Sequence, residues 1–284
     1  MMTNYYNVAG HVFRVSGEDE VFVLMGNYAP FACKEVNDVV FTLNVGKGDA
    51  PIYTEEIRQD EEGQVIVCGR MADKRPVFEF CWGGKTAGWL VCSTDYRETQ
   101  LLVTDSMLKL AVDNALMVLY ALATARKGSV LFHAASVSYQ GYAYMFLGKS
   151  GTGKSTHARL WQQYIDGVEL VNDDNPVVSI MEDGRIRVFG SPWSGKTPCY
   201  RNVSYPLGGI VLLSQAPYNK IERISGIRSY AALVPSISGK RWDEKIADGL
   251  HHTENILASQ VPVWYLECLP DEEAARICNE TITA

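Results

Sequence analysis

Residues 148–156 read Gly148-Lys149-Ser150-Gly151-Thr152-Gly153-Lys154-Ser155-Thr156 and match the phosphate-binding pattern G-x-x-x-x-G-K-[ST] over its full length. The glycines let the backbone curl so that several N–H groups point at phosphate oxygens. Lys154 brings a mobile positive charge to the β- and γ-phosphates, and the Ser155 hydroxyl is a ligand for Mg²⁺. The loop therefore predicts a nucleotide site, with the phosphates held by Gly148, Ser150, Gly151, Thr152, Gly153, Lys154, Ser155 and Thr156.

The segments on either side of this loop support the prediction. Residues 141–147 are apolar and rich in aromatic side chains, which is typical of a buried strand. Residues 156–165 place Trp161, Tyr164 and Ile165 on one face of a helix. A strand, a loop and a helix in this order put the phosphates at the positive end of the helix dipole. A glycine-rich turn without a ligand is the alternative interpretation.

The strand that enters the loop is predicted to belong to a hairpin. Residues 130–139 read as one strand, and Gln140-Gly141 predicts a tight turn into the next. Common parallel-sheet NTPases enter the phosphate loop differently. His133 lies on the first strand of the hairpin, near the base of the loop, so it can orient a nucleophile or donate a hydrogen bond to phosphate. A histidine satisfied within the core is the alternative.

Two adjacent carboxylates follow a predicted strand at 168–172, about twenty residues beyond the loop. Asp173-Asp174 occupies the position at which many nucleotide-binding proteins hold Mg²⁺ close to the loop hydroxyl, here Ser155. One carboxylate can bind the metal while the other accepts a proton from an attacking hydroxyl. A solvated turn before Asn175-Pro176 is the alternative. Two like charges in one buried site repel unless cations offset them, which favours the metal site.

A further turn, Gly190-Ser191-Pro192-Trp193-Ser194-Gly195-Lys196, ends in a lysine that can reach a phosphate. Phosphoryl transfer needs cations around the transferred group, so Lys196 joins the candidate catalytic residues. An ordinary surface loop fits the same residues equally well. His157, on the helix after the phosphate loop, is expected to pack in the core, with a nucleotide contact as the alternative.

The composition limits the classes of function. A net charge of −7 argues against a general nucleic-acid or anionic-membrane surface, because both need a basic face. Seven scattered cysteines without a C-x-x-C pair suit reduced thiols. The first residues lack a signal-peptide pattern, and the longest apolar stretch, 115–125, is too short to span a bilayer. We expect a soluble, cytoplasmic protein that binds neither nucleic acid nor membrane.

Two regions are predicted in the 284 residues. Residues 1–103 read as a β-rich, antiparallel region with strands at 21–25, 39–43, 65–68, 77–82 and 88–92. A core helix at 106–126 follows, and residues 104–284 are assigned to the nucleotide-binding domain. Its later elements are expected to be strands at 209–213 and 261–268 and helices at 229–237, 242–259 and 271–280.

His133, the hairpin, the loop and Asp173-Asp174 together resemble the catalytic domain of HPr kinase/phosphorylase, a relative of ATP-dependent phosphoenolpyruvate carboxykinase. The resemblance covers residues 128–215 well and reaches the C-terminus loosely. It implies an α/β (α+β) domain with the phosphoenolpyruvate-carboxykinase-like P-loop fold, and ATP and Mg²⁺ as cofactors. It also implies that Lys154 and Ser155 bind ATP phosphates and metal, that Asp173 and Asp174 serve metal binding and proton acceptance, and that His133 shares their site.

The chain departs from that family after the aspartate pair. The glycine-rich, arginine-led signature of true HPr kinases is missing, and the Gly190–Lys196 turn stands in its place. We therefore expect an HPr-kinase-related kinase that acts on a hydroxyl of an unidentified peptide, protein or small molecule. The missing signature argues against HPr as the substrate, and the chain is compatible with a homo-oligomer. A non-catalytic nucleotide sensor and a simple NTPase are the alternative functions.

Overall fold

The computed structural model describes residues 1–61, 63–104, 106–195 and 197–284, and these form two compact units, Met1–Thr124 and Ala125–Ala284. Each unit contains a large mixed sheet, so the chain belongs to the mixed α+β class. The predicted boundary at 103/104 differs from this division. The helix α2 (Leu108–Thr124) belongs to the first unit because it packs on β7, β8 and β9 of that unit's own sheet.

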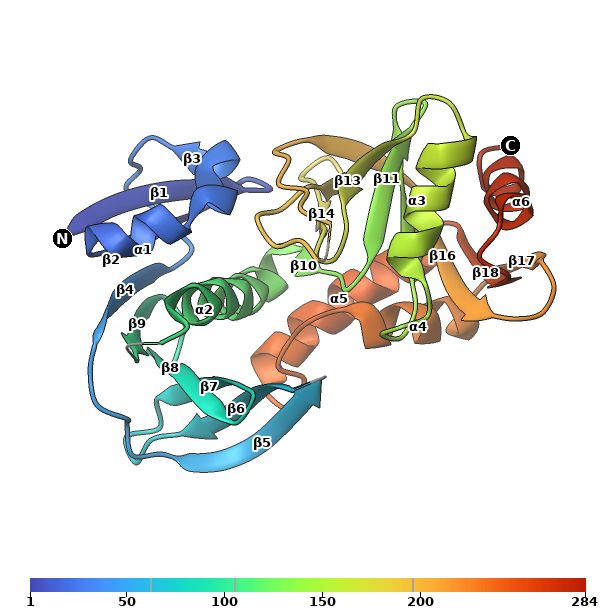
Figure 1. Cartoon of the computed structure of the whole chain (residues 1–284). Coiled ribbons are helices and arrows are strands. Elements are labelled where there is room, and N and C mark those ends of the chain that lie inside the picture. The colour runs from blue at the N-terminus through green and yellow to red at the C-terminus, as the bar shows by residue number, and fades with distance from the viewer. Residues whose placement is uncertain (62, 105, 196) are drawn as a thin grey trace. The chain divides into compact units, whose positions relative to one another are not determined.

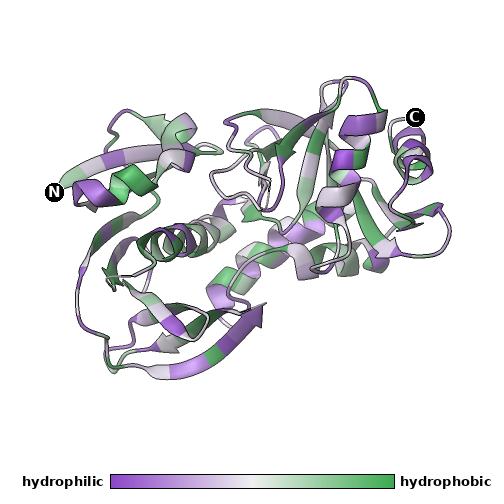
Figure 2. Ribbon diagram, viewed as in Figure 1, coloured by the Kyte–Doolittle hydropathy of each residue, from purple (hydrophilic) through white to green (hydrophobic). Residues whose placement is uncertain are grey.

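Within the described residues, the first unit holds a nine-stranded sheet in the order β3-β1-β2-β4-β9-β8-β7-β6-β5. Its last strand, β5, is almost entirely exposed and is mainly hydrophilic (Figure 2), as expected of an edge strand that must not pair further. The strands are β1 (Met2–Val8), β2 (His11–Gly17), β3 (Ala32–Cys33), β4 (Thr42–Lys47), β5 (Thr54–Glu61), β6 (Gln64–Arg70), β7 (Pro76–Trp82), β8 (Lys85–Cys92) and β9 (Glu98–Val103).

Three predictions for this unit are wrong. The strand predicted at 39–43 begins only at Thr42, so just its last two residues lie in β4. The sheet is not fully antiparallel, because β4 runs parallel to both β2 and β9. The segment 21–25 is not a strand but lies largely in the helix α1 (Asp19–Leu24), which is followed by a 3₁₀ turn at Gly26–Phe31. Asp19 and Glu20 stand in the first turn of α1, where the helix dipole favours negative charge. Only Val21 of this helix is buried.

The predicted core helix is confirmed as α2, which ends in a 3₁₀ turn at Ala125–Lys127 and the left-handed Gly128 (φ 70°). The apolar stretch at 115–125, expected to be too short to span a bilayer, lies within a longer helical segment. Among the described residues, the helical segment Leu108–Lys127 is long and apolar enough to cross a membrane. It is mostly buried within the protein, however, which fits the core helix of a soluble protein.

The second unit is built on a sheet in the order β10-β14-β15-β16-β12-β11-β13, with β18 pairing with both β16 and β17 (Figure 1). The strands β12, β16 and β18 are parallel to one another, and β11 is antiparallel to β12 and to β13. The strands are β10 (Ser129–Leu131), β11 (Ala135–Tyr139), β12 (Tyr142–Leu147), β13 (Glu169–Asn172), β14 (Val177–Ile180), β15 (Ile186–Phe189), β16 (Ser204–Gln215), β17 (Lys220–Ile224) and β18 (Val263–Cys268).

Two helices cover one face of this sheet. The helix after the loop, α3 (Lys154–Tyr164), lies beside α6 (Glu272–Ile282) and packs on β11 and β12 (Figure 1). The fully buried Trp161 of α3 sits against Phe146 and Tyr144 of β12, at the centre of the core of this unit. The remaining helices are α4 (Ile227–Leu233), a 3₁₀ turn at Val234–Ser236 and α5 (Glu244–Gln260), and they confirm the predicted helices at 229–237 and 242–259.

The predicted hairpin is confirmed. Tyr139 pairs with Tyr142, and both turn residues have positive φ, 49° at Gln140 and 84° at Gly141, as a type I′ turn requires. The segment 130–139 is nevertheless not one strand, because β10 stops at Leu131 and β11 starts at Ala135. The break arises because the N–H groups of residues 132–134 donate to three acceptors outside the hairpin, the carbonyl oxygens of Pro176, Ser236 and Asp174.

Candidate functional site

The candidate residues gather at one end of the second sheet. β12 ends at Leu147 and leads into the glycine-rich loop, and β13, which runs in the same direction, ends at Asn172 just before the aspartate pair. The antiparallel β11 begins at this same end, where Ala135 pairs with Phe146. The topology therefore brings the break that carries His133, the loop and Asp173-Asp174 to one edge.

The glycine-rich loop is shaped by three glycines with left-handed φ values, 152° at Gly148, 77° at Gly151 and 108° at Gly153. Other residues rarely adopt such angles, so the loop depends on glycine at these places. Thr152 closes the turn, since its N–H and hydroxyl both donate to the carbonyl of Lys149. From outside, the Gln215 side chain donates to the Gly151 carbonyl at 3.1 Å. Helix α3 begins directly behind the loop, where its first N–H groups lack intrahelical partners.

Lys154, His133 and Asp174 form a continuous chain of polar contacts. Lys154 Nζ lies 2.9 Å from His133 Nε2 and also donates to the Gly148 carbonyl at 3.0 Å. On the other side of the imidazole, His133 Nδ1 lies 3.0 Å from Asp174 Oδ1. Lys154 is buried, whereas the side chains of His133 and Asp174 are 43% and 30% exposed and can meet a ligand.

The contacts of His133 suit one tautomer of a neutral imidazole. A charged Lys154 ammonium can only donate, so Nε2 is the acceptor in this tautomer. The proton is on Nδ1, which can donate to the Asp174 carboxylate. The imidazole therefore holds a carboxylate on one side and a cation on the other, and fixes the orientation of both.

The aspartate pair sits on a turn built by Asn172, which the sequence analysis missed. The Asn172 amide oxygen accepts the N–H groups of Asp174 and Asn175 at 2.9 and 2.8 Å. Its Nδ2 donates to the Ser191 hydroxyl and to the carbonyl of Trp193, both at 3.1 Å. Asparagine side chains favour such turns, and an asparagine at the end of a strand was the signal available in the sequence.

The two carboxylates have different surroundings. Asp173 is buried, and its Oδ2 accepts the N–H of Thr197 at 3.1 Å. Asp174 is more exposed, and its Oδ2 accepts the Asn175 amide at 2.7 Å while Oδ1 faces His133. Each carboxylate oxygen has two acceptor positions, so both groups keep capacity for a metal or a substrate hydroxyl.

The predicted Gly190–Lys196 turn lies against the aspartate pair. Ser191 is buried, and its hydroxyl donates to the carbonyls of Asn175 and Trp193. A Cβ atom added at Gly195 would lie 3.2 Å from Asp174 Cβ, which shows how closely this turn approaches the site. Lys196, the catalytic candidate of the turn, lies outside the described residues, so its role stays a prediction.

The donor set fits magnesium. In the described part of the chain, no three His, Cys, Asp or Glu side chains gather as metal ligands. Ser155, Asp173 and Asp174 offer only oxygen atoms, which Mg²⁺ prefers, and such an ion normally keeps waters and phosphate oxygens in its remaining positions. Ser155 stands in the first turn of α3, next to Lys154, and makes no direct hydrogen bond to either carboxylate among the described residues.

His157 belongs to the core, as expected, and not to the group of candidate residues. It is buried on α3 with its ring edge-on to Phe146, 4.7 Å between centroids, and its Nε2 accepts the Trp161 indole N–H at 3.2 Å. Burial disfavours the charged imidazolium and lowers the pKa of His157 to about 4.

This buried histidine is expected to make the folded protein less stable in acid. The pKa of His157 is lower in the folded protein than its usual value of 6.5, so the unfolded chain binds the extra proton first as pH falls. We expect the free energy of unfolding to drop by about 3 kcal/mol between pH 6.5 and pH 4 through this group. Urea titrations of the wild type and His157→Gln across this range measure the effect, and parallel pH profiles would contradict it.

Comparison with known proteins identifies no relative that could indicate the function. No protein-family model matches the chain. A search of curated proteins finds no significant match either.

Proposed function

We propose that this protein is a cytoplasmic, Mg²⁺- and ATP-dependent kinase of the HPr-kinase-related type, with a phosphoenolpyruvate-carboxykinase-like P-loop fold in its second unit. It would transfer the γ-phosphoryl group to a serine-type hydroxyl. The observation that carries the proposal is the chain Lys154–His133–Asp174 at the base of the glycine-rich loop. In this chain of contacts, His133 connects Lys154, a cation that can bind phosphate, with Asp174, a carboxylate that can accept a proton.

The two aspartates would have different roles, as base and as metal ligand, because their surroundings differ. Asp174 is the partly exposed carboxylate and is the proposed base, with His133 holding its orientation. The buried Asp173 and the Ser155 hydroxyl would hold Mg²⁺. When bound, Mg²⁺ neutralises charge on the β- and γ-phosphates. Lys196 remains a candidate for a second cation at the transferred group.

In this mechanism the acceptor hydroxyl gives its proton to Asp174 as its oxygen forms a bond to the γ-phosphorus. The bond from that phosphorus to the β,γ-bridging oxygen breaks, and ADP leaves with the electron pair. Lys154 stabilises the negative charge that develops on the phosphates. To do so it would exchange its contacts with Gly148 and His133 for phosphate oxygens, and His133 would keep its bond to Asp174.

A transfer assay tests this function. The protein is incubated with Mg²⁺ and ATP labelled in the γ-phosphate, with serine peptides, proteins or small hydroxyl compounds as acceptors. We expect label on at least one acceptor. Phosphate release that no acceptor changes would indicate a simple NTPase, and ATP binding without turnover would indicate a nucleotide sensor. Either result would overturn the kinase proposal.

A further inference from the structure

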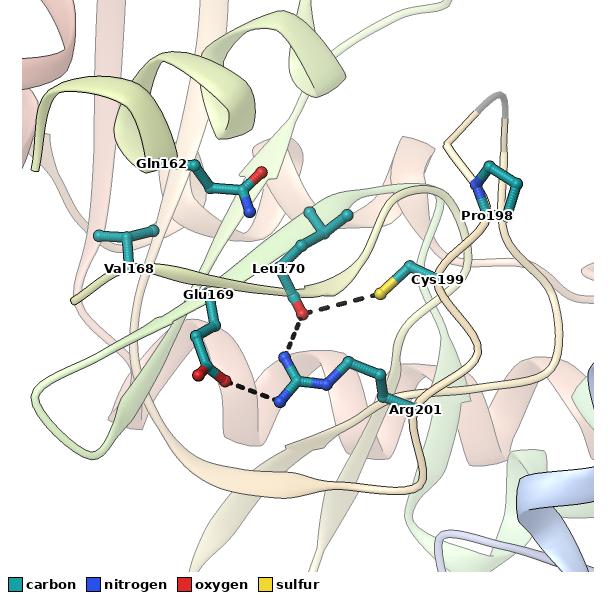
Figure 3. A pocket seen from close by; sticks show the side chains of 7 residues that line it. All are labelled: Gln162, Val168, Glu169, Leu170, Pro198, Cys199 and Arg201. Atoms are coloured by element: carbon teal, nitrogen blue, oxygen red, sulfur yellow. Dashed lines mark hydrogen bonds and ion pairs between the residues drawn. The ribbon is translucent and has the colours of Figure 1, made fainter. Parts of the chain in front are cut away.

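A groove lies along the outer edge of β13, the strand that leads to the aspartate pair. β13 is the last strand of its sheet, and residues 197–201 run beside its free edge (Figure 3). The groove between them and the end of α3 is a shallow depression of about 380 Å³ that is wide open to solvent. Figure 3 shows its lining, made by Gln162, Val168, Glu169, Leu170, Pro198, Cys199 and Arg201.

Side chains, and not a backbone ladder, join the two walls of this edge groove. Arg201 Nη1 donates to the Leu170 carbonyl at 2.7 Å, and the Cys199 thiol donates to the Val171 carbonyl at 3.5 Å. At the other end of the same segment, the Thr197 N–H donates to the Asp173 carboxylate. The segment that forms one wall of the groove is thus bonded to the candidate metal ligand itself.

Through this hydrogen bond, the segment 197–201 links one wall of the edge groove to the candidate site. Burial raises the pKa of the Cys199 thiol; Arg201 opposes this effect and the Asp173 carboxylate adds to it, so all three groups lie within electrostatic reach. Along the chain, Leu170 precedes Asp174, the proposed base, by four residues. A fully extended segment of that length spans about 13 Å, and the turn after Asn172 shortens it, so an extended peptide covers the distance in at most about four residues.

The lining suits a side chain with an apolar stem and a positive end. Val168, Leu170 and Pro198 supply apolar surface for a stem. Glu169 is 59% exposed, and Arg201 contacts one of its two carboxylate oxygens. A carboxylate has about four acceptor positions, so Glu169 can take a further donor. The net charge of −7 also attracts a basic ligand.

An acidic side chain would fit less well. The Arg201 guanidinium is already held by the Leu170 carbonyl and by Glu169 at 2.7 Å each. An incoming carboxylate that used the remaining N–H groups of Arg201 would lie beside the Glu169 carboxylate and would be repelled by its charge.

We propose that the edge groove binds a lysine or arginine of a polypeptide acceptor, within about four residues of the serine that receives the phosphate. This inference rests on the proposed kinase function and narrows its acceptor to a polypeptide. The aliphatic stem packs on Val168, Leu170 and Pro198, and the cationic head donates to Glu169, as long basic side chains do at apolar surfaces with a polar rim.

Serine-centred alanine peptides, in which one lysine is moved from five residues before the serine to five residues after it, test this proposal. We expect kcat/KM for transfer to rise about tenfold when the lysine stands at one position within about four residues of the serine, on one side only. Glu169→Lys should abolish this preference and favour glutamate at that position. Glu182→Lys makes the same charge change at an exposed site in the same unit and should leave the preference intact.

Equal rates for all lysine positions, or a lysine preference that survives in Glu169→Lys, would overturn the proposal. Thermal unfolding of the variants confirms that they fold. Peptide affinity, measured by fluorescence anisotropy on the full chain, separates this inference from the kinase function. If no peptide is phosphorylated but lysine peptides bind and Glu169→Lys reverses the preference, the groove stands and the kinase proposal fails. If ATP labels peptides without regard to lysine position, the kinase stands and the groove proposal fails.

Discussion

Replacing Lys154 with methionine is expected to lower kcat/KM for phosphoryl transfer about a thousandfold. Methionine keeps the length and apolar stem of the side chain but removes the charge that faces the phosphates. It also removes the donor to His133 Nε2, so one side of the imidazole loses its partner. Transfer of labelled phosphate to the best acceptor of the panel, together with ATP affinity from calorimetry, measures the effect.

Lys149→Met is the matched control for this variant. Lys149 lies in the same loop but its side chain is exposed, so we expect a much smaller change in kcat/KM. Thermal unfolding checks that both variants are folded, which matters because Lys154 is buried. Wild-type transfer by a folded Lys154→Met protein would show that this lysine does not stabilise the transferred group.

The aspartates are expected to respond differently to the same chemical change. Asp174→Asn should lower kcat by about 10²–10⁴, the usual contribution of a general base, with little change in ATP affinity. Asp173→Asn should instead raise the Mg²⁺ concentration needed for half-maximal rate, because the amide removes a negatively charged ligand. Magnesium titrations of the initial rate at saturating ATP separate the two effects.

Asp166→Asn is the control for both aspartate variants, since Asp166 is exposed at the end of the segment that follows α3. Its rates should match those of the wild type. If Asp174→Asn transfers phosphate at the wild-type rate and Asp173→Asn does not, the two assigned roles are exchanged. If both variants keep full activity, neither carboxylate acts in the reaction.

The features predicted correctly from the sequence are those specified by nearby residues. The turn at Gln140-Gly141 has its own conformational signature, and the helix after the loop follows from the glycine pattern and the apolar face around Trp161. The break at residues 132–134 has no such signature. Its N–H groups donate to the carbonyls of Pro176, Ser236 and Asp174, which are remote in sequence. The local sequence pattern therefore predicts one continuous strand across this break.

The sequence indicated which residues are candidates for the site, but not the contacts between their side chains. Residue types and spacing identified Lys154, Asp174 and His133, because phosphate and metal chemistry restricts the choice of side chain. The contact of His133 with both partners depends on the break in the strand, and no pattern in the sequence indicates it. The parallel pairs of β4 were missed for a similar reason, since they join strands that are separated along the chain.

The Asn172 side chain couples the aspartate turn to the loop at 191–193, because it forms hydrogen bonds with both segments. One fully buried amide group bonds to both, so a ligand that displaces either segment must strain the other or break these bonds. In the proposed kinase, a metal bound at the aspartate turn and an acceptor bound at the loop would be coupled through this amide, and linkage would make each change the affinity of the other by the same factor. We expect the sign of that cooperativity to depend on which position of the loop each ligand favours.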